Sequence, residues 1–198
     1  MAAKAAAIGF RVKTARAIAV VITGSASAPR VLLRREIDLT DPKMPDSKQP
    51  YHAALELPDA EGRKVVQRAV RAVNAAAQRE FDALAADVEA SGHVLRGVGF
   101  VVGSAGDPAK LGNLHVRAHA LEGRLFWNAL ESAARERGVS SVSLVERDAY
   151  AKASESLGRH PDDLRRTVTE LGREAGRPWG ADEKTAVLAA SVALARKR

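Results

Sequence analysis

Residues 8–39 read IGFRVKTARAIAVVITGSASAPRVLLRREIDL, and this stretch decides the fold. Apolar residues alternate with small or polar residues in three successive runs, residues 8–12, 18–22 and 31–39. A period of two is typical of β-strands. A break near Lys13 and the small-residue turn of residues 24–29 separate the runs. Because connections this short join antiparallel neighbours, the stretch predicts a three-stranded antiparallel meander.

The rest of the chain predicts helices that alternate with two more strands. Residues 40–59 contain four prolines and predict a long irregular loop. Apolar spacing, glycines and prolines then predict, in chain order, helix 61–91, strand 94–102, helix 112–137, strand 139–145 and helices 147–157, 161–173 and 181–195. The two later strands are mostly apolar, as parallel strands usually are. The predicted fold class is α/β, with a five-stranded mixed sheet of three antiparallel and then two parallel strands, flanked by helices.

The composition predicts a single domain, residues 1–198, in the cytoplasm. A chain of 198 residues is expected to bury about 65 to 75% of its unfolded surface without a covalent staple. It has no cysteine, which excludes disulfides and thiolate metal sites and favours a reducing compartment. We expect no signal peptide, because the apolar stretch in the opening MAAKAAAIGFRVK is too short before charged residues interrupt it. No run of the sequence approaches the roughly 18 apolar residues of a membrane span. We therefore expect no membrane partner.

The positive charge is concentrated in the first strands. The formal net charge is +7, and residues 1–37 contain seven basic residues and one acidic residue. A clustered positive field favours a polyanionic partner such as nucleic acid. A composition rich in arginine and alanine also arises from GC-rich genomes, so charge alone leaves both explanations open.

Several segments match, in order and position, the motifs of one known family. Residues 8–13, Ile-Gly-Phe-Arg-Val-Lys, lie on the first strand, residues 117–123 lie on the second long helix, and Lys152 and residues 179–186 lie in the closing helices. In this layout the chain resembles the RuvC-type Holliday-junction resolvases of the ribonuclease H-like superfamily. Their counterparts are a first-strand Gly-Ile-Asp-Pro-Gly, a helix whose glycine (here Gly123) closes on the sheet, a lysine, and an Asp-x-x-Asp-Ala ending. The resemblance spans nearly the whole chain and implies a homodimer.

The acids of that family are the test of its activity. Several carboxylates must converge on two divalent cations, which align a water molecule and stabilise the leaving oxygen of a phosphodiester. By the resemblance, the four acidic positions fall on Arg11, Gly103 or Ser104, Asp182 and Thr185. Asp182 is then the one retained catalytic acid. One carboxylate beside a guanidinium does not hold hard cations, so we expect no cofactor and no metal site.

Relocated acids are the alternative to a lost catalytic site. Asp107, Glu146, Asp148 and Glu183 lie near the ends of the relevant strands or helices. An intact nuclease using these acids would require magnesium or manganese.

Basic residues offer a second interpretation of the same site. An arginine on the first strand puts a permanent cation where the family would hold a metal, and a guanidinium binds phosphate in a bidentate fashion. Arg11, Lys13, Arg34 and Lys152 are therefore our candidate nucleic-acid-binding residues. The alternative is that Arg11 pairs with Asp182 as a structural ion pair.

Other patterns in the sequence carry weaker signals. His115 and His119 stand four residues apart, with Glu122 three further on, so a helix places them on one face within reach of a metal. Because the glutamate of the His-Glu-x-x-His pattern is absent, we interpret them as an ordinary polar face. Residues 103–112 form a glycine-containing strand-to-helix loop that lacks the P-loop pattern. Tyr51-His52 and Trp179 could stack on bases, although we expect Trp179 to pack at the edge of the core.

These observations leave three hypotheses. The first is a non-catalytic or weakly catalytic RuvC-like domain that binds branched or duplex nucleic acid through the basic meander. The second is a protein-interaction module on the same fold, whose protein partner the sequence does not identify. The third is a metal-dependent nuclease with relocated acids.

Overall fold

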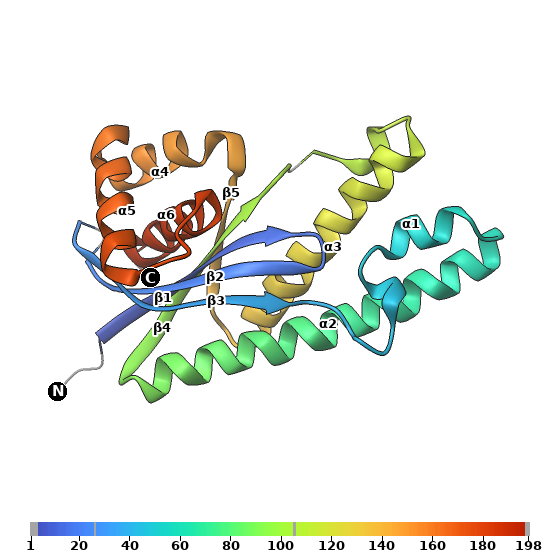
Figure 1. Ribbon diagram of the computed structural model, residues 1–198, viewed down its shortest axis with the longest axis horizontal. Helices are drawn as coiled ribbons and strands as arrows, with labels where there is room; N and C mark the ends of the chain where they lie inside the picture. The colour runs from blue at the N-terminus through green and yellow to red at the C-terminus, as the bar shows by residue number, and fades with distance from the viewer. Residues whose placement is uncertain (1–3, 26, 105, 197–198) are drawn as a thin grey trace.

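The computed structural model describes residues 4–25, 27–104 and 106–196. Its sheet contains β1 (Lys4–Lys13), β2 (Arg16–Gly24), β3 (Pro29–Asp38), β4 (His93–Val102) and β5 (Ser140–Val145), in the order β3-β2-β1-β4-β5. β1 pairs antiparallel with β2 and β2 with β3, whereas β1 pairs parallel with β4 and β4 with β5. The predicted five-stranded mixed sheet is confirmed (Figure 1).

Helices cover both faces of the sheet. They are α1 (Pro50–Leu55), α2 (Asp59–Ala90), α3 (Leu114–Glu136), α4 (Ala149–Leu157), α5 (Pro161–Ala175) and α6 (Ala181–Ala195). α2 and α3 lie on one face, and α4, α5 and α6 lie on the other (Figure 1). Short 3-10 turns occupy Pro45–Ser47, Pro108–Lys110 and Glu146–Asp148.

The prediction of one irregular loop over residues 40–59 is wrong. This segment contains a 3-10 turn and α1, both of which begin with a proline. Proline is tolerated in the first turn of a helix because the N–H that it lacks has no partner there. Four prolines therefore mark two helix starts as well as bends in the chain.

Aromatic rings fill the core between the sheet and helices α2 and α3. Phe10 of β1 stacks on Phe100 of β4 with ring centroids 5.6 Å apart, and Phe81 of α2 lies 6.3 Å from Phe10. Phe126 of α3 is completely buried in the same cluster, and Trp127 packs against it. The even-numbered residues of β1 face this side, so its odd-numbered residues face α6.

Glycines on β1 and β4 let the backbone of α6 lie directly on the sheet. A Cβ at Gly9 would stand 1.9 Å from the carbonyl oxygen of Ala186, and one at Gly99 would stand 2.1 Å from that of Ala189. Such separations are impossible, so only glycine permits this approach. Residues nearer the carboxyl end of β1 contact positions nearer the N-terminus of α6. The first turn of α6 therefore lies at the carboxyl end of β1.

Gly123 does not behave as the family resemblance suggests. It is exposed on α3, and a Cβ there would meet nothing within 4 Å. The expectation that this glycine closes on the sheet is wrong, and the close approach occurs at Gly9 and Gly99 instead. Trp179 packs against the core beside α6, as expected, and donates a hydrogen bond of 2.9 Å to the carbonyl of Val168.

Among the described helices, none combines the length and the apolar character needed to cross a membrane.

Gly99→Ala is expected to lower the free energy of unfolding by about 3 kcal/mol, because the added Cβ forces α6 off the sheet. Gly123→Ala is the matched control, and it should raise stability by up to about 1 kcal/mol because alanine is the better helix former. Urea denaturation of both variants measures the difference. A Gly99→Ala protein as stable as the wild type would contradict the close packing of α6.

Candidate functional site

A cluster of four charged side chains lies at the carboxyl end of β1. The Arg11 side chain is only 8% exposed, and its guanidinium donates to a carboxylate oxygen of Glu146. Its other terminal nitrogen donates to the carbonyl of Val12 at 2.8 Å. The Nε of Arg11 lies 3.7 Å from Oδ1 of Asp182, and the Nζ of Lys13 lies 2.6 Å from Oδ2 of the same carboxylate. Two cations and two carboxylates therefore neutralise one another.

The topology explains why these four residues meet. The carboxyl ends of the parallel strands β1, β4 and β5 lie along one edge of the sheet. Glu146 directly follows β5, and Asp182 stands in the first turn of α6. The seating of α6 on Gly9 and Gly99 carries Asp182 to Arg11. The sequence left an ion pair of Arg11 with Asp182 as the alternative to phosphate binding by Arg11, and the structure contains this pair together with Glu146 and Lys13.

The cluster does not offer a metal the oxygens that a two-cation site requires. Magnesium and manganese prefer several oxygen ligands, and a nuclease presents them as free carboxylates. Here Glu146 is paired with Arg11, and Asp182 is paired with Lys13 and Arg11. The guanidinium of Arg11 lies within ion-pair distance of both carboxylates.

The remaining positions aligned with family acids have other contacts. Gly103 and Ser104 follow β4, and the Ser104 hydroxyl accepts a hydrogen bond of 3.1 Å from the N–H of Gly106. The Thr185 hydroxyl donates to the carbonyl of Ala181 at 3.0 Å. Neither position supplies a carboxylate to the cluster.

The four candidate relocated acids do not converge. Asp107 accepts from the N–H of Ala109, and Asp148 pairs with its neighbour Arg147. Glu183 is buried and accepts from the N–H of Gly180 at 2.8 Å, which caps α6. Of the four, Glu146 alone joins the cluster at Arg11. Its sequence signal was an acid placed immediately after a parallel strand.

Arg34 and Lys152, the other predicted binding residues, lie outside the cluster. The Nε of Arg34 donates to Oε1 of Glu183 at 3.0 Å, so this arginine lies beside the first turn of α6. Lys152 is an exposed residue of α4, and its Nζ lies 2.9 Å from Oε2 of Glu155. This hydrogen bond raises the pKa of Lys152 and lowers that of Glu155.

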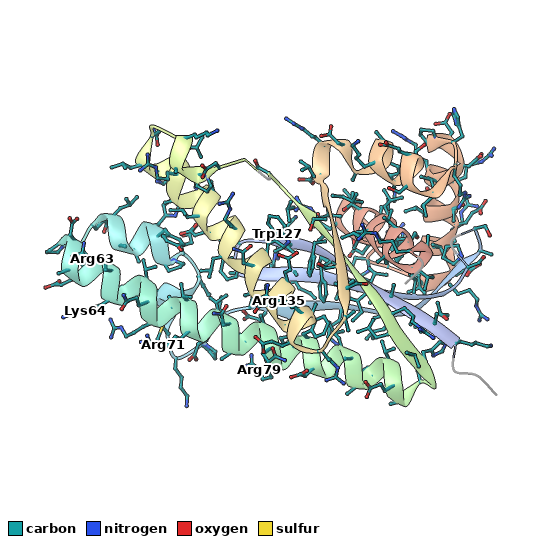
Figure 2. All side chains as sticks on the ribbon, turned by 180° about the vertical axis from the view of Figure 1, so that it is seen from behind. Arg63, Lys64, Arg71, Arg79, Trp127 and Arg135 are labelled. Atoms are coloured by element: carbon teal, nitrogen blue, oxygen red, sulfur yellow. The ribbon has the colours of Figure 1, made fainter. Side chains whose placement is uncertain are left out.

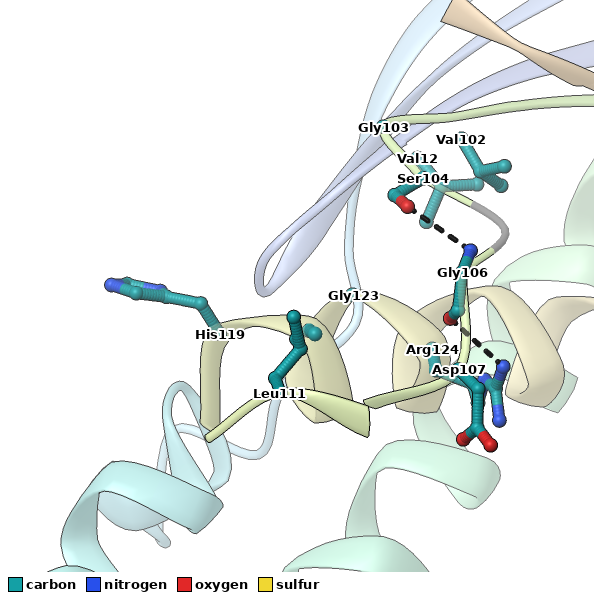
Figure 3. Close-up of a pocket in the computed structure, with 11 residues that line it drawn as sticks. Val12, Val102, Gly103, Ser104, Gly106, Asp107, Leu111, His119, Gly123 and Arg124 are labelled. Carbon is teal, nitrogen blue, oxygen red and sulfur yellow. Dashed lines mark hydrogen bonds between the residues drawn. The ribbon is translucent and has the colours of Figure 1, made fainter. Parts of the chain in front are cut away.

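A pocket of about 330 Å³ lies at the same edge of the sheet, on the side of α3 (Figure 3). Val12 and Val102 line it, together with Gly103, Ser104, Gly106 and Asp107 of the segment that follows β4. Arg124 of α3 donates to the carbonyl of Gly106 at 3.1 Å, which ties this loop to the helix. The hydroxyl of Ser104 and the carbonyl of Gly106 are therefore already hydrogen-bonded within the fold.

A second group of basic residues follows the outer side of α2. It consists of Arg63, Lys64, Arg68 and Arg71, all of them exposed. Figure 2 shows Arg63, Lys64 and Arg71 along this helix. No ion pair of the described residues involves any of the four. Their charge is free to face a partner, and the sequence analysis did not single them out.

The strand order and helical layers define the ribonuclease H-like fold. Within that class, the structure is similar to Thermus thermophilus RuvC in complex with a Holliday junction substrate, with a TM-score of 0.55, 15% identity, and coverage of 94% of this chain and 91% of that one. A second structure of Thermus thermophilus RuvC gives a TM-score of 0.52, 13% identity, and coverage of 94% and 92%. No family model and no curated protein matches the sequence. The chain has the RuvC-type fold that its sequence predicted.

Arg11→Asp is expected to convert the neutral cluster into one that binds divalent cations. The change places three carboxylates together, so the metal-free protein should lose roughly 2 to 4 kcal/mol of stability. Manganese should then raise its melting temperature by several degrees more than that of the wild type, because metal binding favours the folded state.

Arg30→Asp is the control, because Arg30 is an exposed residue of β3 that stands opposite Thr23 of β2. Thermal melts of the three proteins with EDTA and with manganese make the comparison. An equal manganese response in all three would refute the convergence of these side chains.

Proposed function

We propose that this protein binds the backbone of nucleic acid without cleaving it by a metal-dependent reaction. The observation that carries the proposal is the position of Arg11, which is buried and paired with both Glu146 and Asp182. Similarity to a RuvC structure that contains a Holliday junction supports nucleic acid as the partner. The net charge of +7 supports the same class of partner.

The electrostatic argument concerns what a phosphate meets at this edge of the sheet. In a two-metal nuclease, unpaired carboxylates repel the substrate backbone until divalent cations neutralise them. Here Arg11 and Lys13 supply that neutralisation permanently. A phosphate can therefore approach without magnesium, and no metal-activated water is available to attack it. Arg11 acts as the fixed counter-ion.

The contacts to phosphate would come from cations with exposed ammonium or guanidinium groups. Lys13 is 34% exposed at the rim of the cluster, and Lys152 is 61% exposed on α4. Arg34 is 25% exposed beside α6. The cations on α2 form a second group on the other side of the sheet, and the first half of α2 lies at the end of the molecule toward which β1 runs (Figure 1). We assign the larger share of the phosphate contacts to the cations on α2, because none of them would have to break an ion pair with a carboxylate.

The proposal predicts binding of DNA that is independent of magnesium and steeply dependent on salt. With about four phosphate contacts, affinity should fall roughly 100-fold between 50 and 200 mM salt. Labelled four-way junction, duplex and single-stranded DNA, each with EDTA and with magnesium, provide the measurement. No product bands are expected with magnesium.

Two charge-matched double variants locate the surface. Lys64→Glu with Arg68→Glu should weaken binding by at least tenfold, whereas Arg166→Glu with Arg173→Glu on α5 should have a small effect. The two variants change the net charge equally, so a difference between them reports position. Absence of DNA binding under every condition would favour a protein-interaction module, and magnesium-dependent cleavage abolished by Asp182→Asn would establish a nuclease.

A further inference from the structure

Three histidines from two helices meet on the side of the molecule where α1 packs on α3. His52 belongs to α1, and His115 and His119 belong to α3. Their ring centroids lie 4.4 Å apart for His52 and His115, 4.3 Å for His52 and His119, and 4.9 Å for His115 and His119. One nitrogen from each ring lies within 4.8 Å of the other two. A single ion could contact all three nitrogens.

The folding of residues 40–58 creates this group. His115 and His119 are four residues apart, so they share one face of α3. The third histidine comes from α1, which lies in the segment predicted to be an irregular loop. The imidazole of His119 points away from Ser104 and Gly106 (Figure 3). The two α3 rings are exposed and His52 is half-buried, so the group lies at the surface and an ion can enter it.

The carboxylate of Glu122 lies against this group of histidines. The prediction that Glu122 belongs to an ordinary polar helix face is therefore wrong. Its side chain is completely buried, and its Oε1 lies 2.8 Å from Nδ1 of His52 and accepts a second bond from the His52 N–H at 3.2 Å. Its Oε2 stands 3.8 Å from Nδ1 of His119. A buried carboxylate among histidines requires a compensating positive charge.

Two buried atoms of the group have no hydrogen-bond partner among the described residues. They are Nε2 of His52 and Oε2 of Glu122. When the neutral imidazole of His52 donates its Nδ1–H to Glu122, its free lone pair is on Nε2. This is the arrangement by which a carboxylate orients a metal-binding imidazole. The unsatisfied nitrogen therefore points to a ligand.

We propose that His52, His115 and His119 bind one divalent transition-metal ion of the zinc class, with Glu122 as the residue that orients His52. Neutral imidazole nitrogens are preferred ligands of zinc, copper and nickel, whereas magnesium and calcium prefer oxygen. Three protein ligands leave a fourth position of a tetrahedral ion open to water or another ligand. The negative charge of Glu122 compensates part of the charge of the ion.

The site is separate from the cluster at Arg11 and does not depend on the proposed function. Its ligands join α1 to α3, so a bound ion would fix α1, and with it the segment after β3, against the body of the protein. Metal binding should therefore raise the melting temperature without affecting DNA binding. The two proposals can fail independently.

Zinc titration of the full, untagged chain after EDTA treatment tests the site. We expect one zinc ion per chain by calorimetry, and cobalt should give the visible absorption bands of a low-symmetry site. His115→Ala and His119→Ala should each lower zinc affinity by at least 100-fold. Both side chains are exposed, so these variants should keep the wild-type circular dichroism spectrum.

His93 and His160, the other two of the five histidines, provide the controls. His93→Ala and His160→Ala should bind zinc as the wild type does. Glu122→Gln should weaken binding by about 10- to 100-fold, the usual effect of losing a carboxylate that orients a ligand. The proposal is overturned if the wild type binds no stoichiometric zinc, or if His119→Ala and His160→Ala bind it equally well.

Discussion

The direct contact between α6 and the glycines of the sheet is the constraint on which the rest of the structure depends. Gly9 and Gly99 have no side chain to hold the helix away, and the backbone of α6 rests on β1 and β4. Ordinary helix-on-sheet packing would leave a layer of side chains between them. The close approach carries Asp182 to the end of β1, where Arg11 meets it. The geometry of the candidate site is therefore a consequence of backbone packing.

The charges at that site determine what the fold can do. The fold brings the carboxyl ends of β1, β4 and β5 and the start of α6 to one edge of the sheet. In this chain the same edge holds Arg11 and Lys13 against Glu146 and Asp182. Opposite charges at contact distance satisfy one another without an ion. The two carboxylates at this edge therefore already have cations of the chain as their partners.

The sequence predicted the sheet, its mixed topology and the long helices because these depend on local patterns. Alternation over residues 8–39 and apolar spacing around Phe81 are each visible within a short window. The pairing of Arg11 with Asp182 was one of two stated alternatives. Glu146 could be recognised only as an acid near a strand end, because its contact with Arg11 spans 135 positions.

The histidine group was missed for a different physical reason. Because the segment that contains α1 is rich in proline, it was predicted to be a loop. His52 therefore had no predicted position relative to α3. Glu122 looked like a solvent-exposed residue because charged side chains are rarely buried without a partner. The partner, His52, lies 70 residues away in the sequence. Long-range packing, which periodicity does not report, decided both contacts.

Counting the manganese ions bound to the protein tests the central claim most directly. The measurement would use electron paramagnetic resonance of free manganese, without DNA and in a His119→Ala background that removes the histidine group. We predict no stoichiometric manganese, because Arg11 and Lys13 already neutralise the carboxylates. Two bound ions per chain that are lost with Asp182→Asn would contradict the account.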